Sequence, residues 1–244
     1  MHRAIVYHTI SAPEVPLESN IDISPERFEA HLHWLSKRKE HVVPLRKFLS
    51  ASERENLIAI TFDDGFRDNL TVALPLLEKY ELPMTLFIAA GFIGKEGYLS
   101  AEDIQTLASH PLVTIASHGF WHRHLTRASE EEVKFELLES KKLLEEITNK
   151  EIDLLAYPYG DCNENIEKLS EECGYAAAWS VWNGKNTPFS RWRVPLGRND
   201  NLLRFIAKVS PFYFPLKKIL KPPVIDAKGK KAELLQEGEA LSFE

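Results

Sequence analysis

Short apolar runs alternate with helix-like segments along most of the first 200 residues. The runs at residues 4–7, 41–45, 57–62, 83–89, 112–116, 152–156, 175–181 and 193–196 have the length and apolar character of buried strands. Apolar residues recur at helical spacing at 24–37, 70–80, 100–107, 130–148 and 163–173. Strands that alternate with helices indicate a parallel sheet covered by helices. With six or more such units in one domain, we expect a closed (β/α) barrel rather than an open sheet.

Capping residues mark where several of these helices begin and end. Ser24 precedes Pro25, which combines an N-cap residue with proline at the first helical position. Ser100 and Ser129 each have an acidic residue three positions later, the pattern of a capping box. Gly174 follows the last of these helices as a C-terminal cap.

The alternation stops near residue 201, which divides the chain into three parts. We expect the barrel to occupy residues 1–200. A Phe-, Pro- and Lys-rich closing segment follows at 201–224, which we interpret as a helix that closes the barrel rather than a surface for membranes or acidic glycans. Residues 225–244 are polar and have few apolar side chains to anchor them, so we expect a weakly ordered tail.

Composition excludes several classes of protein. The chain has 244 residues, enough for one large α/β domain, and its net charge of −6 gives no general attraction to nucleic acid. No apolar stretch approaches the roughly 20 residues needed to span a bilayer. The N-terminus shows no signal-peptide pattern, so we expect a cytoplasmic protein, or one that is exported or peripheral to a membrane if a leader was removed. The oligomeric state stays open.

The first candidate for chemistry is the sequence Asp63-Asp64-Gly65, which directly follows the apolar run at 57–62. Two adjacent carboxylates raise the cost of ionising each other, so a nearby cation would stabilise them. A simple turn after a strand would also account for this sequence.

The second candidate is the pair His118 and His122, which a helix would place on one face. A polar, histidine-rich loop is the alternative. His118 follows a predicted strand, as Asp63 and Asp64 do, and the C-terminal strand ends of a (β/α) barrel converge on one face. Two imidazoles and a carboxylate would then form a site for one divalent metal ion, Zn²⁺ foremost, with Co²⁺ or Ni²⁺ also suited.

Three ordered motifs resemble those of a known family. They are Thr61-Phe62-Asp63-Asp64-Gly65, Ser117-His118-Gly119-Phe120-Trp121-His122 and Tyr157-Pro158-Tyr159-Gly160. Over about residues 4–200 the chain is similar to the polysaccharide deacetylases, carbohydrate esterases of the NodB-homology type. The resemblance implies a distorted (β/α) barrel of about seven strands and removal of N-acetyl groups from N-acetylhexosamine units. The chain resembles most the subgroup of exopolysaccharide and poly-N-acetylglucosamine deacetylases.

The resemblance also implies roles for individual residues. Asp63 corresponds to the general base, whereas Asp64, His118 and His122 correspond to the metal ligands. The backbone N–H of Tyr159 corresponds to the donor that stabilises the oxyanion. In this scheme the metal activates a water molecule, Asp63 takes its proton, and the water attacks the amide carbonyl.

The general acid departs from the usual family pattern. Many relatives carry a late histidine for this role, but no histidine follows His124. The poly-N-acetylglucosamine subgroup uses an early histidine instead, and His8 at the end of the first predicted strand fits that position. We therefore assign His8 as the general acid.

A second departure concerns the residue that orients Asp63. Many members have an arginine two residues before the proline of the third motif, where this chain has Ala156. We expect Arg198 to replace it, because arginine pairs with carboxylates through two parallel hydrogen bonds, and we keep Arg193 as the second candidate.

The substrate is the least defined part. Phe66, Trp121, Tyr159 and Trp182, with Pro158, are candidate contacts for sugar rings, although aromatic residues near a motif serve packing as often. We expect an N-acetylated glycan or a lipid-linked saccharide as substrate. An amidase or deformylase acting on a small non-sugar amide is one alternative, and a non-catalytic glycan-binding barrel is another.

Overall fold

The computed structural model of the chain describes residues 2–10, 21–181, 187–210 and 213. One compact unit spans Met1–Val209, and a second unit spans Ser210–Glu244. Trp182, the aromatic and basic segment after residue 213, and the expected tail at 225–244 lie outside the described residues. The first unit includes a helix at Leu202–Val209, beyond the boundary expected near residue 200.

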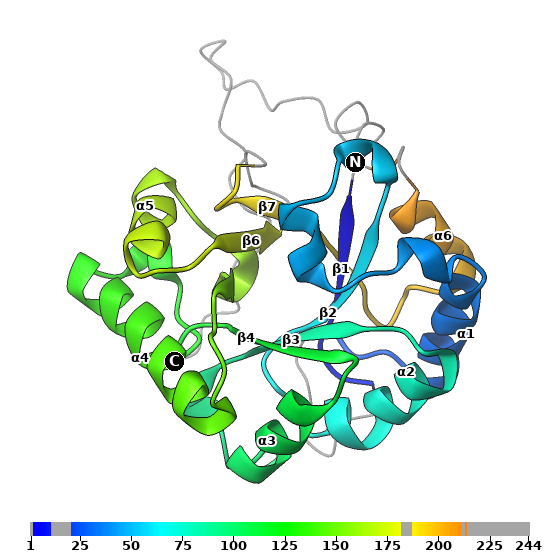
Figure 1. Cartoon of the computed structure of the whole chain (residues 1–244), viewed down its shortest axis with the longest axis horizontal. Helices are drawn as coiled ribbons and strands as arrows, with labels where there is room; N and C mark the ends of the chain where they lie inside the picture. The colour runs from blue at the N-terminus through cyan, green and yellow to red at the C-terminus, as the bar shows by residue number, and fades with distance from the viewer. Residues whose placement is uncertain (1, 11–20, 182–186, 211–212, 214–244) are drawn as a thin grey trace. The chain divides into compact units, whose positions relative to one another are not determined.

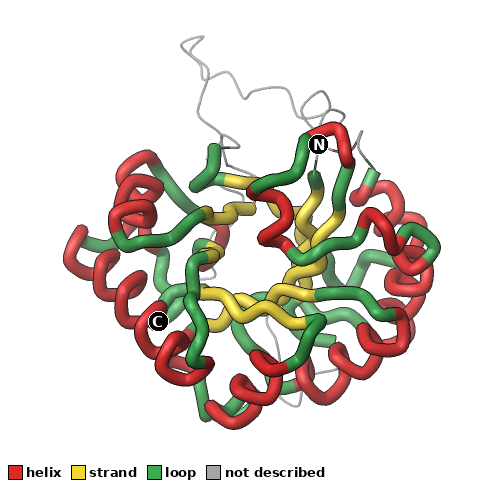
Figure 2. The backbone as a smooth tube through the Cα atoms, in the orientation of Figure 1, coloured by secondary structure: helices red, strands yellow, loops and turns green. Residues whose placement is uncertain are grey.

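The described part of the first unit is built on a closed barrel of seven parallel strands (Figures 1 and 2). The strands follow one another around the barrel in chain order, and β1 closes it by pairing with both β2 and β7. This confirms the expected α/β barrel. The strands are β1 (Arg3–Tyr7), β2 (Ile58–Phe62), β3 (Met84–Ile88), β4 (Val113–Ser117), β5 (Leu154–Ala156), β6 (Ala177–Val181) and β7 (Arg191–Pro195).

The α-helices lie around the outside of the strands (Figure 2). None that the structure describes is long and apolar enough to cross a membrane. The α-helices are α1 (Pro25–Ser36), α2 (Leu74–Tyr80), α3 (Ala101–Ser109), α4 (Glu130–Thr148), α5 (Glu164–Glu172) and α6 (Leu202–Val209). The 3-10 segments are η1 (Lys39–His41), η2 (Leu45–Leu49), η3 (Glu53–Glu55), η5 (Ala90–Phe92), η6 (Leu125–Arg127) and η7 (Pro158–Gly160), and η4 (Asn69–Ala73) is a π-helix.

Local signals in the sequence define most of these boundaries. Ser24 caps α1, and both expected capping boxes, at Ser100 and Ser129, are formed. The strand expected at 41–45 is wrong: Val42 makes only a single bridge, to Ile58, between two 3-10 segments. Pro44 accounts for the difference, because it has no N–H for a strand ladder and instead precedes η2.

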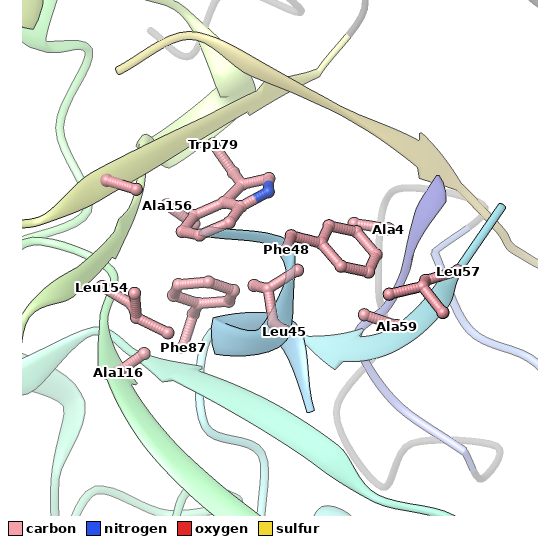
Figure 3. Close-up of a cluster of buried hydrophobic side chains, with 11 residues drawn as sticks. Ala4, Leu45, Phe48, Leu57, Ala59, Phe87, Ala116, Leu154, Ala156 and Trp179 are labelled. Carbon is pink, nitrogen blue, oxygen red and sulfur yellow. The ribbon is translucent and has the colours of Figure 1, made fainter. Parts of the chain in front are cut away.

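The barrel interior is filled by apolar side chains (Figure 3). Leu45 and Phe48 of η2 pack with Phe87 and Trp179 in this cluster. The cluster also contains alanines from several strands, whose small side chains leave room for these larger ones: Ala4, Ala59, Ala116, Ala156 and Ala177. Because apolar side chains fill the interior, the polar candidate site residues lie at the C-terminal ends of the strands.

Candidate active site

The three expected metal ligands meet at the C-terminal ends of β2 and β4. The ligand atoms of Asp64, His118 and His122 all lie within 4.8 Å of one another. His118 Nε2 is 3.5 Å and His122 Nε2 is 3.3 Å from Asp64 Oδ1. The convergence expected from the barrel therefore brings together residues that are more than 50 positions apart in the sequence.

His118 and His122 lie on a loop and not on a helix. Gly119 has φ 73° and His122 has φ 55°, both left-handed, which interrupts any helical course. The helical interpretation of their spacing is therefore wrong, although the two rings still face one site. Backbone hydrogen bonds tie this loop to the end of β3 and to η5: His118 N–H to Ile88 O (2.9 Å), Ala90 N–H to Gly119 O (3.0 Å) and Gly91 N–H to Phe120 O (2.7 Å).

The histidines are in the form that binds metal. His118 Nδ1 donates to the Ala156 carbonyl oxygen at 2.8 Å, because a carbonyl can only accept, and this leaves the Nε2 lone pair facing Asp64. Burial lowers the pKa of His118 to about 3 and that of His122 to about 4. Both imidazoles are therefore neutral at neutral pH, as metal ligation requires.

Asp64 supplies a further indication of a cation. Its Oδ1 is buried and has no hydrogen-bond partner among the described residues, although it faces the Nε2 lone pair of His118. Burial, with a contribution from the neighbouring Asp63 carboxylate, raises the pKa of Asp64 to about 6. Acceptor atoms that face each other without a proton between them are stabilised by a cation. The residues present thus fit one divalent metal ion.

Asp63 is held by Arg193. Arg193 is fully buried in β7, and its Nη1 and Nη2 donate to Asp63 Oδ1 and Oδ2 at 2.5 and 2.7 Å. Burial alone would raise the pKa of Asp63, but Arg193 and His118 outweigh it and hold this pKa at about 2. The carboxylate is therefore ionised and fixed in orientation.

Arg198 does not reach this site. Its guanidinium binds Asp22, with Nε to Oδ2 at 3.0 Å and Nη2 to Oδ1 at 2.9 Å, and its side chain is 54% exposed. Arg198 lies beyond the end of β7, whereas Arg193 lies in the middle of that strand, opposite Ala4 of β1. The expectation for Arg198 is wrong, and the second candidate, Arg193, is the partner of Asp63.

His8 follows β1 at the same end of the barrel as Asp63. An electrostatic interaction with His8 contributes a lowering to the pKa of both Asp63 and Asp64, so His8 lies within electrostatic range of the two carboxylates. His8 Nδ1 is buried without a hydrogen-bond partner among the described residues. The backbone is held by Asn69 of η4, whose side-chain amide donates to His8 O at 2.8 Å.

Tyr159 lies next to the candidate ligands, in a strained conformation. Its φ of 59° is unusual for a residue other than glycine, and such strain is common at functional sites. The exposed ring stacks on His124 at 3.8 Å between centroids and lies 4.5 Å from the His122 ring. Buried Asp161, two residues later, accepts a hydrogen bond from Thr126 at 2.5 Å and pairs with His124 Nδ1 at 3.2 Å.

The candidate sugar contacts differ in exposure. Trp121 is 43% and Tyr159 is 57% exposed, so both rings are accessible beside the site. Phe66 stacks on Tyr98 at 4.9 Å, and Pro158 is buried at the start of η7. Trp182 lies outside the described residues.

Two buried carboxylates near the site, Glu136 and Asp161, were missed in the sequence. Glu136 stands between Phe135 and Leu137, and it shares the buried face of α4 with Val133 and Leu137. A carboxylate on an apolar helix face is a signal that could have revealed it.

Comparisons with known proteins identify the family of this chain. The family model for polysaccharide deacetylase matches residues 50–178. The Bacillus subtilis protein YxkH, which carries a provisional assignment as a polysaccharide deacetylase, is 31% identical over 70% of this chain, and the match spans 61% of its own length. A poly-beta-1,6-N-acetyl-D-glucosamine N-deacetylase of Staphylococcus aureus is 26% identical over 76% of this chain and 69% of its own length.

Solved structures share the fold. The Streptococcus pyogenes deacetylase PplD superimposes with a TM-score of 0.76 at 20% identity, over 86% of this chain and 98% of that one. IcaB from Ammonifex degensii superimposes with a TM-score of 0.69 at 20% identity, over 85% of this chain and 95% of that one. Because the family model covers more than half of the sequence and its motif residues converge on one site, this chain belongs to the polysaccharide deacetylase family.

Proposed function

We propose that this protein is a metal-dependent hydrolase that removes N-acetyl groups from N-acetylhexosamine units of a poly- or oligosaccharide. The observation that carries the proposal is the ionised Asp63, fixed by buried Arg193 beside three residues suited to a divalent metal. Arg193 thus fills the role expected of an arginine at position 156. The name of the Staphylococcus aureus relative supports a poly-N-acetylglucosamine substrate.

The proposed metal site consists of Asp64, His118 and His122. These residues would hold a divalent ion, with zinc the first choice and cobalt or nickel the others, which would supply Lewis-acid polarisation of the amide and of water. Asp63 accepts a hydrogen bond from the attacking water. Because its pKa of about 2 makes it a weak base, Asp63 orients the water and receives the proton late in the step.

Two other groups complete the proposed reaction. The Tyr159 backbone N–H donates to the developing oxyanion, and the left-handed conformation of Tyr159 fixes the direction of that N–H. His8, at the end of β1, donates a proton to the leaving amine. The water oxygen becomes part of the acetate, and the sugar keeps the free amino group.

The exposed rings at the site support a sugar substrate. Trp121 and Tyr159 offer apolar faces next to the candidate ligand His122, in the manner that aromatic rings bind apolar surfaces of ligands. A lipid-linked saccharide would present the same rings to the site as a free glycan.

The test is acetate release from N-acetylglucosamine oligomers by the full chain supplied with Zn²⁺. We expect release that is abolished by a chelator, restored by added metal, and reduced at least about 10²-fold in Asp63→Asn, because the general base is removed. Small N-formyl and ureido amides are assayed in parallel. Turnover of these amides alone would exclude the sugar substrate, and saccharide binding without turnover by the metal-loaded protein would exclude catalysis.

A further inference from the structure

The loop that carries His118 and His122 is clamped by a buried carboxylate from outside the three motifs. Glu136 lies on α4 and is 1% exposed. Its Oε2 accepts hydrogen bonds from the backbone N–H groups of Phe120 and Trp121, each at 2.7 Å. Burying a carboxylate is costly unless it is paired or hydrogen-bonded, so these two bonds account for its presence inside the protein.

The opposite side of the same loop is held by the segment after β3. The bonds from Ala90 N–H and Gly91 N–H to the loop leave little space: a Cβ on Gly91 would lie 2.5 Å from Trp121 Cε3. On the Glu136 side, a Cβ on Gly119 would lie 3.1 Å from the carboxylate Oε2. The loop is therefore confined between η5 and α4.

This confinement matters because of the conformation that it imposes. His122 has φ 55°, a left-handed conformation that is uncommon for residues other than glycine. The two N–H groups that Glu136 binds lie between the two candidate ligands in the sequence. The carboxylate thus acts on the part of the backbone that sets the direction of the His122 ring.

We propose that Glu136 is a positioning residue for the metal centre: by accepting the Phe120 and Trp121 N–H groups, it fixes the separation and direction of His118 and His122. The inference rests on the metal site of the proposed function, and it adds a residue to that site which none of the three motifs contains. Outer residues that orient ligands commonly change metal affinity about 10- to 100-fold when they are replaced.

A competing explanation is that Glu136 acts through its charge alone. Its second oxygen, Oε1, is buried, and Arg123 Nε lies 3.8 Å away. A carboxylate near the site would attract a cation whether or not it shaped the loop. The positioning role requires a side chain long enough to reach the Phe120 and Trp121 N–H groups. The competing explanation requires only a negative charge.

Two variants separate reach from charge. Glu136→Gln keeps an acceptor at full length without charge, whereas Glu136→Asp keeps the charge on a side chain one methylene shorter. Zn²⁺ affinity of the full chain is measured by competition with a chromophoric chelator, and folding is checked by thermal unfolding. We expect Glu136→Asp to lose about 10- to 100-fold in affinity and Glu136→Gln to lose less than about tenfold. Glu139→Asp and Glu139→Gln, at an exposed position of the same helix, serve as matched controls and should bind as the wild type does.

A second readout needs no metal. Hydrogen exchange of the segment 118–122 in the metal-free protein should be faster in Glu136→Asp than in the wild type, and nearly unchanged in Glu136→Gln. A larger loss of affinity in Glu136→Gln than in Glu136→Asp, or wild-type affinity in both, would overturn the inference. If the wild type bound no Zn²⁺, the proposed metal function would fail, and unchanged exchange in Glu136→Asp would then overturn the positioning role as well.

Discussion

The buried pair of Arg193 and Asp63 offers the sharpest test of the structure. Both side chains are 4% exposed or less, and two parallel hydrogen bonds join them. The perturbation is Arg193→Met, which keeps an unbranched apolar stem and removes the guanidinium. In this variant Asp63 stays buried without its main counter-charge.

The expected magnitude follows from the geometry. At a charge separation of ~4 Å and an effective dielectric constant of ~20, the pair attracts with ~4 kcal/mol. Removing one partner of a buried pair typically destabilises a protein by about 3–5 kcal/mol, because the remaining charge is uncompensated. We expect a loss in this range for Arg193→Met, and a similar loss for Asp63→Asn, which leaves the Arg193 charge buried.

The double variant makes the test specific. In Arg193→Met/Asp63→Asn no buried charge is left at the pair, so its stability should lie closer to the wild type than that of either single variant. The assay is urea unfolding at neutral pH with chelator present, which keeps metal out of all four proteins. Additive losses in the double variant, or a loss below about 1 kcal/mol in Arg193→Met, would refute the assignment of Arg193 as the partner of Asp63.

Three further outcomes follow from the site and the fold. Asp64→Ala should lower Zn²⁺ affinity by well over about 100-fold, since it removes a ligand itself, and retention of Zn²⁺ after gel filtration would contradict the assignment. His8→Asn should reduce acetate release about 10²-fold or more while Zn²⁺ affinity stays unchanged, and equal activity would exclude His8 as the acid. Burial lowers the pKa of His31 to about 4 from 6.5, so its neutral form is favoured in the folded state. The stability linked to His31 should be present above pH 6.5 and decline by about 3 kcal/mol as the pH falls to about 4, and His31→Phe should flatten this part of the urea-measured pH profile.

The elements and the convergence of the motifs could be predicted from the sequence because they depend on local pattern. Apolar runs defined the seven strands, and serine caps defined the starts of α1, α3 and α4. Once a barrel was expected, residues after β2 and β4 had to share one end, as Asp64, His118 and His122 do.

The helical spacing of His118 and His122 was misleading for a physical reason. The left-handed Gly119 takes the chain out of a helix, and contacts with η5 and α4 then decide the path of the loop. Such contacts come from distant parts of the chain, so periodicity within the loop could not reveal them.

Arg193 and Glu136 were harder to find because their roles depend on how deeply their side chains are buried. Each is a charged residue on the buried face of its element, Arg193 in β7 and Glu136 in α4. The residue pattern marks both positions as unusual, but the partner of each depends on strand register and helix packing. The sequence favoured Arg198 over Arg193, but Arg198 lies beyond the end of β7 and binds Asp22 instead.

The alanine at position 156 and the arginine at position 193 are structurally related, because both lie in the same part of the barrel interior. Ala156 belongs to the interior cluster with Phe87 and Trp179. The Arg193 guanidinium lies over the same Phe87 ring, with its central carbon 5.1 Å from the centroid. Asp63 can satisfy one guanidinium with its two oxygens, so a second arginine from β5 would bring an unpaired positive charge into the same interior. The guanidinium that pairs with Asp63 comes from β7, because Arg193 is level with Ala4 of β1, the strand that also pairs with β2 and leads to His8.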